Sequence, residues 1–143
     1  MMVYRGTTMN SYINELERQA LSISKRLTAY LLIDDYDSAV DYLSLLNELD
    51  EQQDIWVVSN RAAVNPLDLQ LESMPFEIIE EQEEYAGLMQ RAFAGITAEG
   101  NFHDDIHGGL RYAVAVPVMG FNGEVMGALI YSSAADGQTQ VIN

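Results

Sequence analysis

Apolar residues recur every three or four positions through the first long segment of the chain, Asn10 to Ile33. This apolar seam consists of Ile13, Leu16, Ala20, Ile23, Leu27 and Tyr30. A repeat of this spacing places its residues on one side of an α-helix. Leu21 and Leu31 widen the seam, so the helix can be covered both by its own sheet and by a second copy. The pattern alone leaves open whether the seam forms only a core or also a dimer contact.

The helical period stops at a polar stretch and then resumes. Asp34 to Ser38 supply N-cap residues for a second helix, Ser38 to Glu51, so a helical hairpin is expected. The β-branched run Asp54 to Asn60 is bounded by polar residues and predicts the first strand. Asn60 to Pro75 lacks a period, which indicates a loop with at most one turn of helix.

A third helical pattern, Glu80 to Phe93, is followed by Gly95, a natural terminator. Thr97 to Phe102 then predicts a polar strand, and His103 to Gly109 a loop. These segments lead into the last recognisable unit of the chain.

Two apolar, β-branched runs between Leu110 and Ser133 flank Asn122-Gly123, a dipeptide typical of hairpin turns. Pro117 lies inside the first run and lacks an amide donor, so it must occupy a sheet edge or a bulge. The connections between the three C-terminal strands are too short for a parallel crossover. We therefore expect antiparallel neighbours, with a tail from Ala134.

Length and composition indicate one α+β domain, residues 1–143, with a core of about 10–133. Hydrophobic residues make up 48% of the chain and charged residues 20%, as in folded globular proteins. The absence of cysteine excludes disulfides and thiolate metal sites. We find neither a signal peptide nor the roughly 20 apolar residues that a membrane helix requires, and expect a soluble chain.

The charge balance narrows the range of partners. The 22 acidic and 7 basic residues give a formal net charge of −15. Nucleic acid is excluded as a partner, because binding phosphates requires a basic surface. An anionic lipid surface would also repel this chain.

The order of elements and two motifs resemble the extracytoplasmic PAS-like (Cache or PDC type) sensor domains of bacterial sensor histidine kinases. The first strand and turn read DIWVVSNRAAV, and the crossing helix ends in LMQRAFAG. The most specific part is RYAVAVPVMGFNGEVMGALIYSS, which resembles the usual ending of those sensors. The resemblance spans Ile13 to Ser133. It implies an antiparallel sheet with the long N-terminal helix packed on one face.

The resemblance also implies a cellular context. Such domains lie outside the cytoplasm between two transmembrane helices of a membrane protein, and both flanking helices are absent from this chain. Members typically form homodimers through the N-terminal helix, here Ile13 to Tyr30. They take up a small ligand or ion between the sheet and the crossing helix. The alternative is a cytoplasmic PAS or GAF-like domain for protein interaction or dimerisation, without a ligand.

The polar segment HDDIHGGLR contains the candidate binding residues. Two imidazoles and two carboxylates, those of His103, Asp104, Asp105 and His107, are competent ligands for a divalent transition metal. The i, i+4 spacing of the histidines aims both at one ion only on a helix, whereas the glycines make this a loop. A solvated polar loop is therefore the alternative.

Arg111 is the only basic side chain after Arg91. A lone cation on an acidic domain is suited to a carboxylate ligand, and the carboxylate-sensing branch of the family holds ligands with basic residues in this region. The resemblance implies a ligand site formed by Arg111, Tyr112, His103 and His107, and Val114, which shares a strand face with Tyr112, is expected to border it. The alternative is an arginine paired with one of the acids of its own chain.

The segment Glu72–Glu84 is rich in glutamate. The six glutamates between Glu72 and Glu84 permit a divalent cation site, but glutamates are also common at helix starts.

Neither a phosphate loop nor a nucleophile elbow is present. We expect no cofactor and no catalysis by this chain, although the full-length protein is expected to be a histidine kinase.

Overall fold

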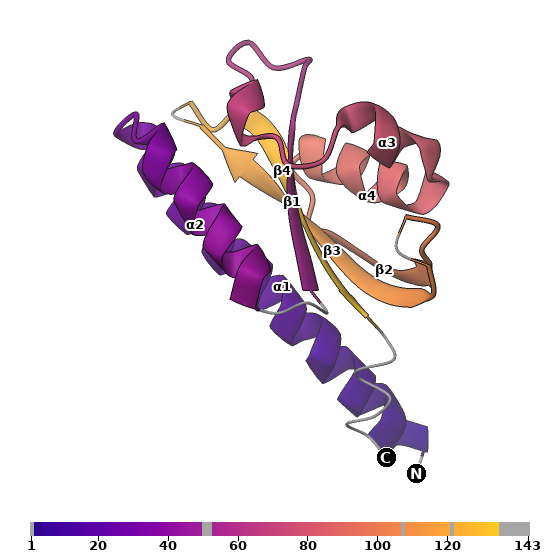
Figure 1. Ribbon diagram of the computed structural model, residues 1–143. Coiled ribbons are helices and arrows are strands. Elements are labelled where there is room, and N and C mark those ends of the chain that lie inside the picture. The colour runs from indigo at the N-terminus through magenta and orange to yellow at the C-terminus, as the bar shows by residue number, and fades with distance from the viewer. Residues whose placement is uncertain (1, 50–52, 107, 121, 135–143) are drawn as a thin grey trace.

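The computed structural model describes residues 2–49, 53–106, 108–120 and 122–134 (Figure 1). A four-stranded antiparallel sheet, in the order β1–β4–β3–β2, separates two layers of helices. Its elements are α1 (Met2–Leu32), α2 (Tyr36–Leu49), β1 (Gln53–Ser59), the 3₁₀ turn η1 (Leu69–Leu71), α3 (Phe76–Glu81), α4 (Glu83–Phe93), β2 (Ala98–His103), β3 (Leu110–Met119) and β4 (Val125–Ala134). The predicted α+β class and the antiparallel order of the last three strands are confirmed.

Helix α1 packs along one face of the sheet and extends beyond it at its N-terminal end (Figure 1). The seam residues Leu16, Ala20 and Leu27 are at most 2% exposed, because they meet the side chains of β1, β3 and β4. The predicted packing of the long helix on one face is therefore confirmed. These residues are covered by their own sheet, and a homodimer through the Ile13–Tyr30 helix stays a prediction.

Helices α3 and α4 cover the opposite face (Figure 1). The prediction of one helix starting at Glu80 is wrong, because Gln82 is extended and separates α3 from α4. The side chain of Gln82 donates to the carbonyl of His103 at 3.0 Å and accepts the amide of Asp105 at 3.0 Å. These contacts hold Gln82 against β2 and explain the break.

The closing hairpin has the predicted strands and turn. Gly123 has a φ of 72°, in the left-handed region that glycine tolerates. Pro117 lies beyond the last residue of β3 that pairs with β2, and its carbonyl accepts a bond from Ser24 Oγ of α1. The strand register shifts between Val118 and Met119. Pro117 thus lies at a local edge beside a bulge, as predicted.

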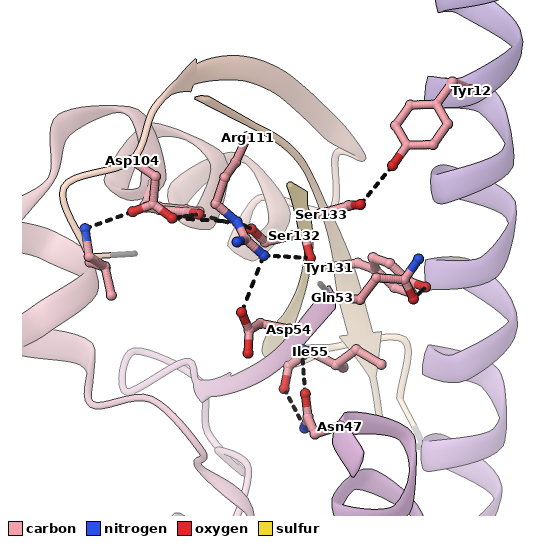
Figure 2. A network of polar contacts seen from close by, with 12 residues as sticks. Tyr12, Asn47, Gln53, Asp54, Ile55, Asp104, Arg111, Tyr131, Ser132 and Ser133 are labelled. Atoms are coloured by element: carbon pink, nitrogen blue, oxygen red, sulfur yellow. Dashed lines mark hydrogen bonds and ion pairs between the residues drawn. The ribbon is translucent and has the colours of Figure 1, made fainter. Parts of the chain in front are cut away.

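The outer edge of β1 is covered by side chains instead of a strand. Asn47 of α2 accepts the amide of Ile55 at 2.8 Å and donates to its carbonyl at 3.1 Å (Figure 2). Further along, Ser73 Oγ accepts the amide of Val57, and Glu72 accepts that of Ser59. The outward amides of Ile55, Val57 and Ser59 therefore each have a side-chain partner.

None of the described helices is both long enough and apolar enough to cross a bilayer.

Candidate functional site

A buried arginine lies at the centre of a polar network that joins several strands. Arg111 of β3 is 6% exposed, and its Nε donates to Ser132 Oγ of β4 at 2.7 Å. Its Nη2 donates to Asp54 Oδ2 of β1 at 3.2 Å and to the Ser132 carbonyl at 3.2 Å (Figure 2). Three neighbouring strands therefore contribute to the binding of one guanidinium group.

Asp104 supplies the second acid of this network and is fully buried. Its Oδ2 lies 3.6 Å from Arg111 Nε and accepts the hydroxyl of Tyr85 at 2.9 Å. Its Oδ1 accepts the amide of Ile106 at 2.7 Å, so the carboxylate also holds the loop after β2. A buried carboxylate of this kind is tolerated because a guanidinium and several donors compensate its charge.

Tyr85 of α4 joins the helix layer to this network. Its ring packs against Trp56 and Phe102, and its hydroxyl also lies 3.1 Å from Ser132 Oγ. Burial, and to a smaller extent the neighbouring carboxylate of Asp104, raises the pKa of the Tyr85 hydroxyl, against a lowering by the Ser132 contact. The phenol is therefore neutral and available as a donor at physiological pH.

The five residues predicted to bind a ligand do not line one pocket. Arg111 points toward α4, whereas Tyr112 and Val114 lie in the core under α1. Successive residues of a strand point to opposite faces, so Arg111 and Tyr112 cannot share a side. His103 is exposed, and His107 lies outside the described residues. The expectation of a single pocket is corrected, while ligand binding by any of them stays a prediction.

The candidate metal ligands are also separated. The carboxylate of Asp104 is turned inward to Arg111. His103 and Asp105 are exposed, and His103 Nδ1 lies 3.6 Å from Asp105 Oδ1. No group of three potential metal ligands gathers in the part of the chain that the structure describes.

The acidic segment Glu72–Glu84 is partly neutralised by its own chain. Arg61 pairs with Glu77 at 2.7 Å and with Glu72 at 3.3 Å. The guanidinium of Arg61 lowers the pKa of the Glu77 carboxyl. These two glutamates thus have a partner that a cation would have to displace.

Sequence reasoning missed Ser132 and Asp54 as direct partners of Arg111, and it missed Tyr85, which joins the network through Ser132 and Asp104. An arginine paired with acids of its own chain was one of the two alternatives, and the structure has this arrangement. The acids that it uses, Asp104 and Asp54, are distant from each other in the chain. The alternation of residues along β3 could have predicted the direction of the Arg111 side chain, because it places Arg111 among the small residues that face α4.

The next residue of β4, Ser133, faces the opposite layer. Its hydroxyl lies 2.6 Å from that of Tyr12 in α1, and the Tyr12 ring meets Tyr112 edge-on with centroids 5.2 Å apart (Figure 2). Ser132 and Ser133 therefore connect the Arg111 network to the N-terminal helix through one peptide bond.

A separate groove of about 570 Å³ runs between α4 and the outer strand β2. It is lined by Glu83, Glu84, Gly87, Leu88, Arg91, Glu99, Gly100, Asn101 and Phe102. Charged side chains and strand backbone thus border the same groove.

Comparisons with known proteins identify the fold. No protein-family model matches the chain, and no curated protein does. The sensor domain of the histidine kinase DctB from V. cholerae matches 90% of this chain with a TM-score of 0.58 and 16% identity. A C-terminal domain from Streptococcus mutans matches 70% of this chain and 87% of its own length, with a TM-score of 0.44 and 14% identity.

The match to the DctB sensor domain is partial in length. This chain spans about half of that solved chain, since 51% of it is covered. The chain has the α+β, PAS-like fold of a histidine kinase sensor domain.

Proposed function

We propose that this chain is the extracytoplasmic sensing domain of a bacterial membrane-bound histidine kinase. It binds a small ligand or ion and passes the signal to its terminal elements, and it is not itself catalytic. The observation that carries the proposal is the contact between Tyr12 and Ser133, combined with the sensor-domain fold. The first helix and the last strand are the elements that would continue into the membrane.

A ligand-induced change near Arg111 has a short route to this contact. Arg111 and Tyr85 both bind Ser132 Oγ, and Ser133 follows in the same strand. A shift of β4 that breaks or tightens the Ser132 contacts would also move the partner of Tyr12. In a two-state receptor, such a shift favours one position of α1 over another.

An anionic ligand would reach Arg111 by replacing Asp54. The Asp54 side chain is 33% exposed, whereas that of Asp104 is fully buried, so only the former is open to exchange with solvent. A carboxylate is the chemical class that matches the donor Nη2. The candidate ligands are therefore small carboxylates, with divalent cations as the second class to examine.

A thermal-shift screen of carboxylates, amino acids and divalent cations tests the sensing role. A ligand at a hundred times its dissociation constant should stabilise the fold by about 2.7 kcal/mol. For a carboxylate, Arg111→Lys should weaken the response, and Asp54→Asn should strengthen it by removing the competitor. Lys25→Glu on the exposed face of α1 is the control that should leave the response unchanged.

The second candidate is a cytoplasmic PAS or GAF-like interaction domain without a ligand. It is favoured by the two acids that already pair with Arg111. Fractionation of the full-length protein separates the candidates, because a sensor domain of the proposed kind is recovered with the membrane. Recovery in the soluble fraction, without a hit in the screen, would overturn the sensor proposal.

A further inference from the structure

The two edges of the sheet differ in how their backbone groups are satisfied. On β1 the outward groups belong to Gln53, Ile55, Val57 and Ser59, and the last three of these are bound by Asn47, Ser73 and Glu72. In an antiparallel sheet, outward and inward backbone groups alternate along each strand. The strand registers carry this alternation from β1 through β4 and β3 to β2. On β2 the outward backbone groups are therefore those of Glu99, Asn101 and His103.

Only one end of the β2 edge is covered by the described residues. The Gln82 side chain binds the His103 carbonyl and the Asp105 amide, much as Asn47 binds Ile55. No described residue binds the outward backbone groups of Glu99 and Asn101, whose side chains are also exposed. This uncovered stretch borders the groove beside α4. Unpaired strand edges of this kind are templates for another strand.

We propose that a second copy of this chain occupies this edge, so that two β2 strands pair antiparallel across a two-fold axis at Gly100. The register places Glu99 of each copy opposite Asn101 of the other. A carboxylate therefore faces an amide and not a second carboxylate. The two outward residues of each copy exchange amide and carbonyl bonds. This inference does not depend on the proposed sensing function.

The charges of the groove support a copy of the same chain as the occupant. Helix α4 runs antiparallel to β2, because Gln82 contacts His103 and Leu88 lies beside Gly100. Glu83 and Glu84 therefore lie at one end of the groove and Arg91 at the other. A two-fold axis at Gly100 brings the Arg91 end of one copy to the glutamate end of its partner. Arg91 of each copy thus meets Glu83 and Glu84 of its partner, while Glu99, which also lines the groove, lies near the axis opposite Asn101.

The alternative surface for self-association is already used. The seam of α1 is buried against its own sheet, with Leu16 and Leu27 at most 2% exposed. At the groove, a Cβ added to Gly87 of α4 would meet no atom within 4 Å, so there is room beside the strand edge. The contact is short, and we expect weak association that tethering in a larger protein would strengthen.

Sedimentation equilibrium of the chain up to about 1 mM tests the proposal, since tethered domains reach effective concentrations of this order. Salt of about 0.15 M screens the long-range repulsion between two acidic chains. We expect a monomer–dimer equilibrium. On dimerisation the amides of Glu99 and Asn101 should become protected from hydrogen exchange. A monomer over the whole range would overturn the proposal.

Two variants separate this interface from any other. Asn101→Pro removes an outward donor without touching the ladder to β3, and should weaken dimerisation roughly tenfold because symmetry removes two bonds at once. Arg91→Glu should also weaken it, and adding Glu83→Arg and Glu84→Arg should restore it. Lys25→Glu makes the same charge change on α1 and is the control. A dimer that is insensitive to both variants would place the interface elsewhere.

Discussion

The hydroxyl groups of Tyr12 and Ser133 lie 2.6 Å apart, although 121 positions separate the two residues in the chain. The contact fastens the N-terminal helix to the end of the last strand (Figure 2). Ser133 is paired with Tyr112, on whose ring that of Tyr12 packs. One polar and one aromatic contact thus fix the relative position of α1 and β4.

Removing the Tyr12 hydroxyl should have a measurable cost. Tyr12→Phe keeps the aromatic contact and deletes the hydrogen bond, so we expect a loss of about 0.5–1.5 kcal/mol in unfolding free energy by urea denaturation. Ser133→Ala should cost a similar amount. If the two hydroxyls act through each other, the double variant should cost less than the sum. Strict additivity would contradict the contact.

Arg111→Ala should be among the most damaging single changes on the sheet. It leaves the buried carboxylate of Asp104 without its guanidinium, which typically costs about 3–5 kcal/mol. Asp54→Ala should cost less than about 1 kcal/mol, because the Asp54 side chain is 33% exposed. Chemical denaturation of both variants tests this order, and equal losses would contradict it.

The raised pKa of Tyr85 predicts a loss of stability in alkali. The unfolded phenol ionises at its ordinary value of 10.0, whereas the buried phenol holds its proton to higher pH. Above pH 10 the folded state therefore binds more protons than the unfolded state, and unfolding becomes easier as pH rises.

Tyr85→Phe provides the test of this pH dependence. It should be less stable than the wild type at neutral pH, because two hydrogen bonds are lost. Its stability should nevertheless fall less steeply above pH 10. Denaturation midpoints across the alkaline range measure both effects, and parallel curves would show that another group is responsible.

Two glycines should respond oppositely to alanine. A Cβ at Gly127 of β4 would lie 2.5 Å from the carbonyl oxygen of Val58, so Gly127→Ala should destabilise the fold by about 1–3 kcal/mol. A Cβ at Gly87 on the exposed side of α4 meets nothing within 4 Å. Gly87→Ala should stabilise the helix by about 0.5–1 kcal/mol. Thermal unfolding of both variants tests the pair.

The local pattern of the sequence was sufficient for most elements. The seam from Ile13 to Tyr30 and the hairpin around Asn122-Gly123 are repeats that depend on residues close in the chain. The break at Gln82 was missed because its cause is a contact with β2, about twenty positions away. The seam itself did not reveal which partner covers it, since a sheet and a second helix select the same apolar spacing.

The binding network was harder to predict than the fold. Arg111 was identified as unusual because it is a lone basic residue, but its partners come from two other strands and from the loop after β2. The alternation of β3 would have separated Arg111 from Tyr112 and Val114. Hydrogen-bond partners of Ser132 and Tyr85 depend on the strand register and the crossing position of α4, which short-range patterns do not determine.

The capping of β1 by Asn47 has a consequence for how large an assembly can become. A sheet with two open edges can add further copies at both ends and grow into a fibre. Among the residues that the structure describes, α2 and the loop that follows β1 close the β1 edge, and the β2 edge is left to accept a neighbour. Pairing of two β2 strands uses the open edge of both copies, and growth ends at two. Asn47→Ala would free only the backbone groups of Ile55, because Ser73 and Glu72 still bind Val57 and Ser59, so the association should still end at two copies.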